Sequence, residues 1–245
     1  MTKDDILDRI RRGRTDLVFD LLALPDWRAA LSNEKPLRWF VYYGDVTAMK
    51  AVLAAGGDLS SLDLDEELGH ASFFGHWRMV DFLLAHGANA NAAHGETGET
   101  PLHSTLCKAG RPGFLYVLRL LLAAGAKVNA RTFSGKETGA FMRDVRTKGE
   151  TPLHRAAAYG DEAMIQLLLD HGADCEARDG HGDSPLTWAS LHLRPGSILA
   201  QLQFGPHKIG PAHVAAITSD HGCGWGNGME RNFLGDYLPE SRSKA

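Results

Sequence analysis

The sequence has few cysteines and no long apolar run, and each shortage excludes a class of protein. Its three cysteines, Cys107, Cys175 and Cys223, are odd in number and form no C-x-x-C pair. A disulfide framework is therefore not expected, and a reducing compartment is favoured. No stretch approaches the roughly 18 apolar residues of a membrane span, and the N-terminus MTKDDILDRIRRGR lacks the apolar segment of a signal peptide. We expect a cytoplasmic protein with no membrane partner.

An excess of one charge and the common catalytic motifs are also missing. The chain has 26 Lys and Arg against 30 Asp and Glu, a formal charge of -4, which is too balanced for a surface that binds nucleic acid as a whole. There is no P-loop, G-x-S-x-G, H-E-x-x-H or G-x-G-x-x-G. The glycine-rich GCGWGNG at 222–228 lacks a Lys and a following helix pattern. We therefore expect no enzyme, no cofactor and no nucleic-acid partner.

What the sequence does contain is an internal repeat. The best copy, GETPLHRAAAYGDEAMIQLLLDHGADCEA, runs over residues 149–177, and shorter copies begin with GETPLHSTL at Gly98 and GDSPLTWAS at Gly182. Two weaker copies begin at Lys35 and Leu68. A twelve-residue spacing, which separates Gly160 from Gly172, recurs from Gly44 to Gly56, Gly75 to Gly87, Gly113 to Gly125 and Leu193 to Gly205. Before them, RTDLVFDLLALP after Gly13 has the outline of a second helix without its first.

Each copy predicts a pair of helices. Thr151 suits an N-cap and Pro152 the first helical position, while Gly160 ends the first helix and Gly172 supplies a left-handed C-cap. The apolar faces of the two helices are formed by Leu153, Ala156 and Ala157, and by Met164, Leu167, Leu168 and Leu169. A single pair cannot bury this surface, so stacked pairs are expected to form an all-α solenoid.

These residues resemble the ankyrin repeat, whose motif T-P-L-H-x-A is complete at residues 151–156, covers four positions at 100–103 and is partial at 184–189. The resemblance implies an ankyrin-repeat solenoid of helix-turn-helix units with β-hairpin-like fingers. It predicts an N-terminal helical cap or partial repeat at 1–34, five repeats at 35–205, and a C-terminal cap or tail at 206–245. It also implies that the motif histidines, His103 and His154, form hydrogen bonds within and between turns.

The largest departure from the repeat is the segment 131–148, which we call the finger. Fourteen residues are extra there, and five Lys and Arg against two Asp and Glu give a local charge of +3. One interpretation is a recognition loop for an acidic partner, contacted by Arg131, Lys136, Arg143 and Arg146 and anchored by Phe141 and Met142. The other is a loop that folds over the solenoid and buries Phe141 and Met142. The stretch GAFMRDVRTKGETPLHRAA also resembles that of a group of bacterial ankyrin-repeat proteins. A shorter insertion of four residues falls near 108–111.

The tail 206–245 has no repeat signature. His213, Asp220, His221 and Cys223 are metal ligands by residue type, but their spacing matches no closed zinc pattern, so no metal is predicted. A Cys–His pair for catalysis is conceivable, although His221 and Cys223 are neighbours only in sequence. The alternative is a cap, in which Trp225, Phe233, Leu234 and Tyr237 cover the last repeat. The tail can equally fold back along the groove.

In the ankyrin family, partners contact the first helices and the fingers. The equivalent positions here are rich in aromatic rings and histidines, as hot spots often are. Carried over, they are Trp39, Tyr42, Tyr43, Asp45, His70, Phe74, His76, Trp77, Ser104, Lys108, Arg155, Tyr159, Asp161, Trp188, His192 and Arg194. The alternative is that several rings pack between repeats, and Phe40 and Phe73 are the better core candidates. Histidines 70, 76 and 192, if they share one face, predict pH-sensitive binding.

Three functions are compatible with these patterns. The first is a non-catalytic module that binds a protein partner through the groove and the basic finger. The second is a small-molecule-binding protein or enzyme with a pocket closed by the finger and the tail. The third is an oligomer-forming role, in which finger and tail dock onto another copy.

Overall fold

The computed structural model describes residues 1–107, 112–138 and 146–204, and every named element in these ranges is a helix. The chain divides into two compact units. Unit 1 comprises residues 1–92 and 111–126, and unit 2 comprises residues 93–110 and 127–245. The all-α expectation is therefore confirmed for the described residues, whereas the boundaries at residues 34 and 205 stay predictions.

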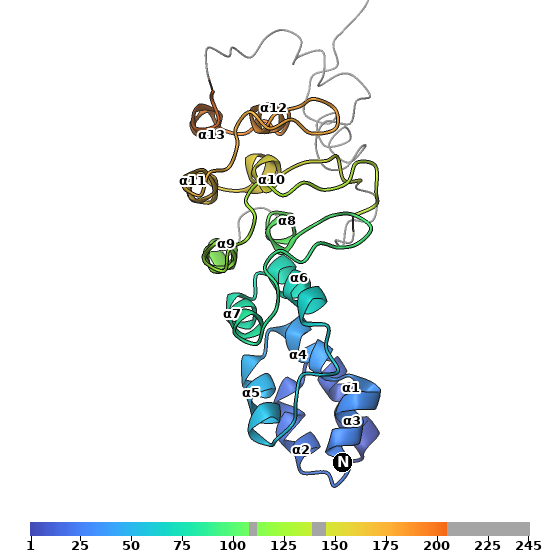
Figure 1. Cartoon of the computed structure of the whole chain (residues 1–245). Helices are drawn as coiled ribbons and strands as arrows, with labels where there is room; N and C mark the ends of the chain where they lie inside the picture. The colour runs from blue at the N-terminus through green and yellow to red at the C-terminus, as the bar shows by residue number, and fades with distance from the viewer. Residues whose placement is uncertain (108–111, 139–145, 205–245) are drawn as a thin grey trace, which may run out of the picture. The chain divides into compact units, whose positions relative to one another are not determined.

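Unit 1 is built from two rows of short helices (Figure 1). Its elements are α1 (Lys3–Arg11), η1 (Thr15–Leu17), α2 (Val18–Leu22), α3 (Trp27–Glu34), α4 (Leu37–Tyr43), α5 (Val46–Ala54), α6 (Leu64–Phe74), α7 (Trp77–Ala85) and α9 (Pro112–Ala123). Helix α4 packs against α6 in one row, and α2, α5, α7 and α9 follow one another in the other. Phe40, Met49, Met79 and Leu83 are fully buried between the rows, and Phe73 is buried as well. The prediction that Phe40 and Phe73 belong to the core is confirmed.

The N-terminus has a helix that the repeat register did not predict. Helix α1 begins with a capping box in which Thr2 and Asp5 exchange side-chain and backbone hydrogen bonds, and it buries Ile6 and Ile10 one turn apart. It packs against α2, so the segment after Gly13 does have a first helix. The prediction was wrong here because α1 carries a generic capping signal and an i, i+4 apolar pair instead of the repeat motif.

Unit 2 repeats the same pairing. Its helices are α8 (Pro101–Thr105), α10 (Pro152–Tyr159), α11 (Glu162–Asp170), α12 (Pro185–Leu191) and α13 (Gly196–Gln201). Helix α10 lies beside α12 and α11 beside α13 (Figure 1). The predicted signals at the best copy are confirmed: Thr151 is the N-cap, Pro152 follows it, Gly160 caps α10, and Gly172 has a φ of +82° just after α11.

The motif histidines link successive turns, as the resemblance implied. The Nδ1 atom of His154 accepts a hydrogen bond from the Thr151 amide at 3.1 Å, and its Nε2 lies 3.0 Å from the Asp183 carbonyl. His103 makes the same contacts with the Thr100 amide and the Glu150 carbonyl, at 3.2 and 3.3 Å. Because one nitrogen accepts and the other donates, each ring is held as the neutral Nε2–H tautomer.

The described part of the finger is paired backbone to backbone. The Gly135 amide donates to the Thr147 carbonyl at 2.6 Å, and the Thr147 amide donates to the Lys136 carbonyl at 2.7 Å. An isolated antiparallel bridge joins Glu137 to Arg146. No strand is named in the arms that the structure describes, so a full β-hairpin finger stays a prediction.

Leu193 occupies a backbone conformation that suits glycine. Its φ is +52°, close to the left-handed values of Gly44 and Gly75 at equivalent positions, and its side chain is 62% exposed. We expect Leu193→Gly to raise the free energy of unfolding by about 0.5–1 kcal/mol. Strain of roughly 1–2 kcal/mol is relieved, offset by about 0.4–1 kcal/mol of added freedom in the unfolded chain.

Urea titration at neutral pH measures this change. Leu193→Ala is the matched control, because it removes the same exposed side chain but keeps the strained backbone, and no gain is expected from it. An equal gain in both variants contradicts the role of backbone strain.

Candidate functional site

Five of the side chains near the turns of unit 1 form a continuous set of ring contacts, which we call the aromatic surface. It consists of Trp39, Tyr42, Tyr43, Phe74 and His76. Tyr42 is the central ring: its centroid lies 5.9 Å from Trp39, 4.9 Å from Tyr43 and 4.9 Å from Phe74, all edge to face. Phe74 stacks on His76 at 5.7 Å. Tyr42 and Tyr43 remain 40% and 38% exposed, so rings that are already ordered face solvent.

The turn between α4 and α5 positions this surface. Gly44 ends α4 with a φ of +71°, and a Cβ atom there would lie 2.8 Å from the His76 ring, so only glycine lets the two turns approach. The Nε2 atom of His76 lies 3.0 Å from the Tyr42 carbonyl, which fixes the imidazole against the preceding repeat. The repeat glycine therefore has a specific role here: it admits the histidine of the next repeat.

Helix α1 adds a cation to the aromatic surface. The guanidinium of Arg11 lies 5.9 Å from the Trp39 ring centroid, and the Tyr43 hydroxyl donates to the Arg11 carbonyl at 2.8 Å. Arg11 was not predicted as a contact because it lies outside the repeat register. The only available signal was a basic residue in the last turn of a helix whose start was also missed.

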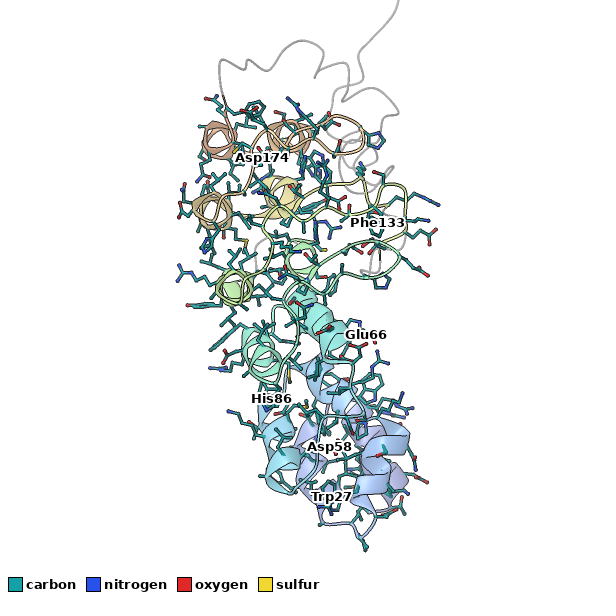
Figure 2. The ribbon with its side chains drawn as sticks, in the orientation of Figure 1. Trp27, Asp58, Glu66, His86, Phe133 and Asp174 are labelled. Atoms are coloured by element: carbon teal, nitrogen blue, oxygen red, sulfur yellow. The ribbon has the colours of Figure 1, made fainter. Side chains whose placement is uncertain are left out.

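A charged cluster surrounds His70 on α6. The buried carboxylate of Glu67 accepts from Arg38 Nε at 2.8 Å and lies 3.2 Å from His70 Nδ1. Arg38 also pairs with Glu66 at 3.1 Å; Figure 2 labels Glu66. The hydrogen bond to Glu67 raises the pKa of His70.

Asp45, another predicted contact, is the N-cap of α5. Its Oδ1 atom accepts a hydrogen bond from the Ala48 amide at 2.9 Å, so one of its carboxylate oxygens is already engaged within the chain.

Trp77 lies at the start of α7 and is 37% exposed. It packs against Tyr116 of α9 at a centroid distance of 5.7 Å, and Arg78 lies 4.6 Å from the Trp77 ring centroid. Tyr116, 54% exposed, was not predicted, because it sits on the second helix of its repeat, outside the family's contact positions.

Two of the predicted contact residues in unit 2 are not at the surface. Arg155 and Trp188 are fully buried, so the prediction that they face the groove is wrong. The Trp188 indole donates to Asp179 Oδ2 at 3.0 Å and packs against His154 at 5.4 Å. The alternative interpretation, rings that pack between repeats, applies to Trp188.

Arg155 is buried because two carboxylates surround it. Its Nε and Nη2 atoms donate to Glu150 Oε1 at 2.8 and 2.6 Å, and Nη2 also donates to Glu99 Oε1 at 2.8 Å. Its Nη1 donates to the His103 carbonyl at 3.0 Å and to Cys107 Sγ at 3.3 Å. Burial alone would raise the pKa of Glu150, but Arg155 and the nearby hydrogen bonds lower it to about 2. Burial lowers the pKa of His103 to about 4 and raises that of Cys107 to about 12, so both side chains are neutral at pH 7.

Tyr159 and His192 are half-buried neighbours in unit 2, with ring centroids 5.1 Å apart. Burial, assisted by the positive charges of Lys148 and Arg194, lowers the pKa of His192 to about 4. His70 has its pKa shifted in the opposite direction, so a common response of the groove histidines to pH is not expected. Binding that depends on pH through His70, His76 and His192 stays a prediction.

Of the finger's predicted contacts, Arg146 is exposed, with Nη1 donating to the Gly135 carbonyl at 2.8 Å and Nη2 3.6 Å from Glu137 Oε1. Phe133, labelled in Figure 2, is 53% exposed. Arg143, Phe141 and Met142 lie outside the described residues, as do the insertion at 108–111 and the tail from residue 205. The prediction that the finger and tail cover a groove depends on these residues and stays a prediction.

No group of three or more His, Cys, Asp or Glu side chains in residues 1–107, 112–138 and 146–204 is arranged to hold a metal ion. Over the same ranges, none of the helices is both long and apolar enough to cross a bilayer.

Sequence comparisons identify the repeat. Residues 97–133 match the sequence model of the ankyrin repeat, and residues 142–189 match that of ankyrin repeats in many copies. The chain is 32% identical over 186 residues to human neurogenic locus notch homolog protein 2, covering 67% of this chain and 7% of that protein. It is 41% identical over 163 residues to human ankyrin repeat and SOCS box protein 16, covering 53% and 35%.

A plant protein shows a similar but shorter match. The E3 ubiquitin-protein ligase KEG of Arabidopsis thaliana is 31% identical over 106 residues, which is 43% of this chain and 5% of that protein. The chain thus spans 35% of the length of ankyrin repeat and SOCS box protein 16, and only 7% and 5% of the other two relatives.

Proposed function

We propose, from the ankyrin repeats that this chain carries, that it is a non-catalytic module that binds a protein partner. Ankyrin repeats are generally protein–protein interaction modules. The contact residues are those of the aromatic surface in unit 1 and the basic finger in unit 2. The partner is a protein with acidic groups, and neither a nucleic acid nor a membrane is the target.

The aromatic surface is the single observation that carries this proposal. Edge-to-face contacts at 4.9 Å hold Tyr42 against Tyr43 and Phe74, so little side-chain entropy is lost when a partner docks. Partly exposed tyrosines and a tryptophan, held rigidly, are the residue types that dominate binding energy in protein interfaces. Arg11, stacked over Trp39, adds a guanidinium beside them that suits a carboxylate.

The finger supplies the second contact. Arg131, Lys136 and Arg146 are exposed on its described arms, and the whole segment has a net charge of +3. Exposed cations of this kind raise the rate of association with an acidic partner more than they raise affinity. A cytoplasmic location and a relation to bacterial ankyrin-repeat proteins belong to the same proposal; the first is supported by the odd and dispersed cysteines, the second by the sequence around the finger.

Truncation of the central ring tests the aromatic surface. We expect Tyr42→Ala to weaken partner binding by about 30-fold, the effect of losing a hot spot worth about 2 kcal/mol. Partners are first captured by cross-linking to the full chain and identified, and the recovered protein is then titrated against each variant. Phe19→Ala is the control, because Phe19 is 61% exposed on α2 and is not part of the aromatic surface.

A variant that lacks the inserted residues of the finger tests the second contact. We expect a lower association rate and a weaker dependence of that rate on salt. If Tyr42→Ala binds as the full chain does, the aromatic surface is not the contact. Unchanged partners and rates without the finger exclude its role.

A further inference from the structure

We propose that Arg155 is the positioning residue of the finger: through two buried carboxylates it fixes where both arms of the finger lie on unit 2. The inference rests on the proposed function insofar as the finger is a contact for a partner. Its geometry, however, belongs to unit 2 alone and can be tested without a partner.

The two carboxylates bind Arg155 and the finger at the same time. Glu150 gives Oε1 to Arg155 and Oε2 to the finger, where it accepts from Thr132 Oγ1 at 2.5 Å and from the Lys148 amide at 2.7 Å. Glu99 accepts from Arg155 Nη2 at 2.8 Å and from Thr138 Oγ1 at 2.5 Å. Through these carboxylates, Arg155 is linked to three points of the finger. Thr132 and Lys148 lie at its two ends, and Thr138 is the last described residue of its first arm.

The residues that join Arg155 to the finger are buried from solvent. Arg155 and Glu150 are fully buried, and Thr132, Thr138 and Lys148 are buried as well, although most of the first arm between residues 133 and 137 is exposed. Charge-assisted hydrogen bonds are strongest where water is excluded. The arms of the finger are thus held by a few buried hydrogen bonds, and these bonds fix the positions of the exposed residues between them.

A network of this kind adds little to stability, because removing three charged groups from water costs about as much as their attraction returns. Its effect is geometric: the planar guanidinium sets the separation of the two carboxylates, and these set the positions of Thr132 and Thr138. A lysine at 155 carries the charge but lacks the fork that contacts both carboxylates at once.

Hydrogen exchange at the finger amides tests the proposal. We expect Thr132→Val/Thr138→Val, which removes the threonine hydrogen bonds from the finger to the two carboxylates but leaves Arg155 paired, to speed exchange of the Gly135, Thr147 and Lys148 amides at least tenfold. Exchange in α11 should be unchanged. Arg155→Met should have the same local effect beyond any change in α11, and Arg155→Lys should not restore protection.

Thr105→Val is the matched control, because Thr105 is a buried threonine that bonds within α8, to the Pro101 carbonyl at 2.8 Å, away from the finger. Trypsin cleavage after Lys136 and Arg146 gives a second readout, expected to accelerate in the double variant but not in Thr105→Val. The proposal is overturned if the finger amides of Thr132→Val/Thr138→Val exchange as in the unaltered chain. It is also overturned if those of Arg155→Met change only as much as α11 does. If deleting the finger leaves partner binding intact while exchange behaves as expected, the finger's role in recognition fails and the positioning by Arg155 stands.

Discussion

Replacing Arg155 with methionine is expected to lower the free energy of unfolding by about 3–5 kcal/mol, the cost of removing one partner from a buried charge network. The loss is large because Glu99 and Glu150 both lose, in the interior, the guanidinium that pairs with them. Methionine fills much of the same space, so the effect is electrostatic more than a matter of packing. Urea titration monitored by circular dichroism at pH 7 measures it.

The control is Arg146→Met, which removes an exposed guanidinium paired at 3.6 Å with Glu137. A change within about 0.5 kcal/mol is expected there. A further variant, Arg155→Met/Glu99→Gln/Glu150→Gln, removes the negative charges of the two buried carboxylates and should recover part of the loss. A cost below about 1 kcal/mol for Arg155→Met, or no recovery in the triple variant, contradicts a buried network that needs its cation.

The helix pairs of unit 2 could be predicted from sequence because their signals are local. Thr151, Pro152 and Gly172 act within one or two turns, and their conformations follow from N-capping, a fixed φ and the absence of a Cβ atom. The burial of Arg155 could not be predicted in this way. It depends on Glu99, 56 residues earlier in the chain, and on hydrogen bonds to a finger that the repeat pattern does not contain.

Part of the candidate site was predictable for the same reason. Tyr42, Tyr43 and Phe74 precede repeat glycines, and the register places them at the turns where they lie in the structure. Arg11 and Tyr116 were missed because one belongs to a helix without the repeat motif and the other to a second helix. The two G-E-T-P-L-H segments did contain a signal for this buried charge network. Each has a glutamate at its second position, Glu99 or Glu150, and Arg155 follows the second segment directly.

Lowering the pH from 7 to 5 is expected to destabilise the chain by about 2 kcal/mol for each histidine that is buried as the neutral form. The pKa of His103 is about 4 in the folded chain, against 6.5 for an ordinary histidine. Between these values the unfolded chain binds a proton that the folded chain does not, so stability falls as the pH falls from about 6.5 towards 4. His192 has a pKa of about 4 and adds a loss of the same sign. His70, whose pKa is raised by Glu67, acts in the opposite direction.

The hydrogen bonds explain why His103 resists protonation. Its Nδ1 already accepts from the Thr100 amide at 3.2 Å, so a proton on this nitrogen would face a donor, and the positive charge of Arg155 is held in the same buried region. Thermal and urea unfolding at pH 7, 6 and 5 measure the effect, with His103→Asn expected to be less stable at pH 7 but to show a smaller loss on acidification. His181→Asn, at an exposed histidine of unit 2, should retain the full pH dependence. Constant stability between pH 7 and 5 in the unaltered chain would mean that these rings are protonated in the folded state, and that the bonds linking successive turns tolerate a charged imidazole.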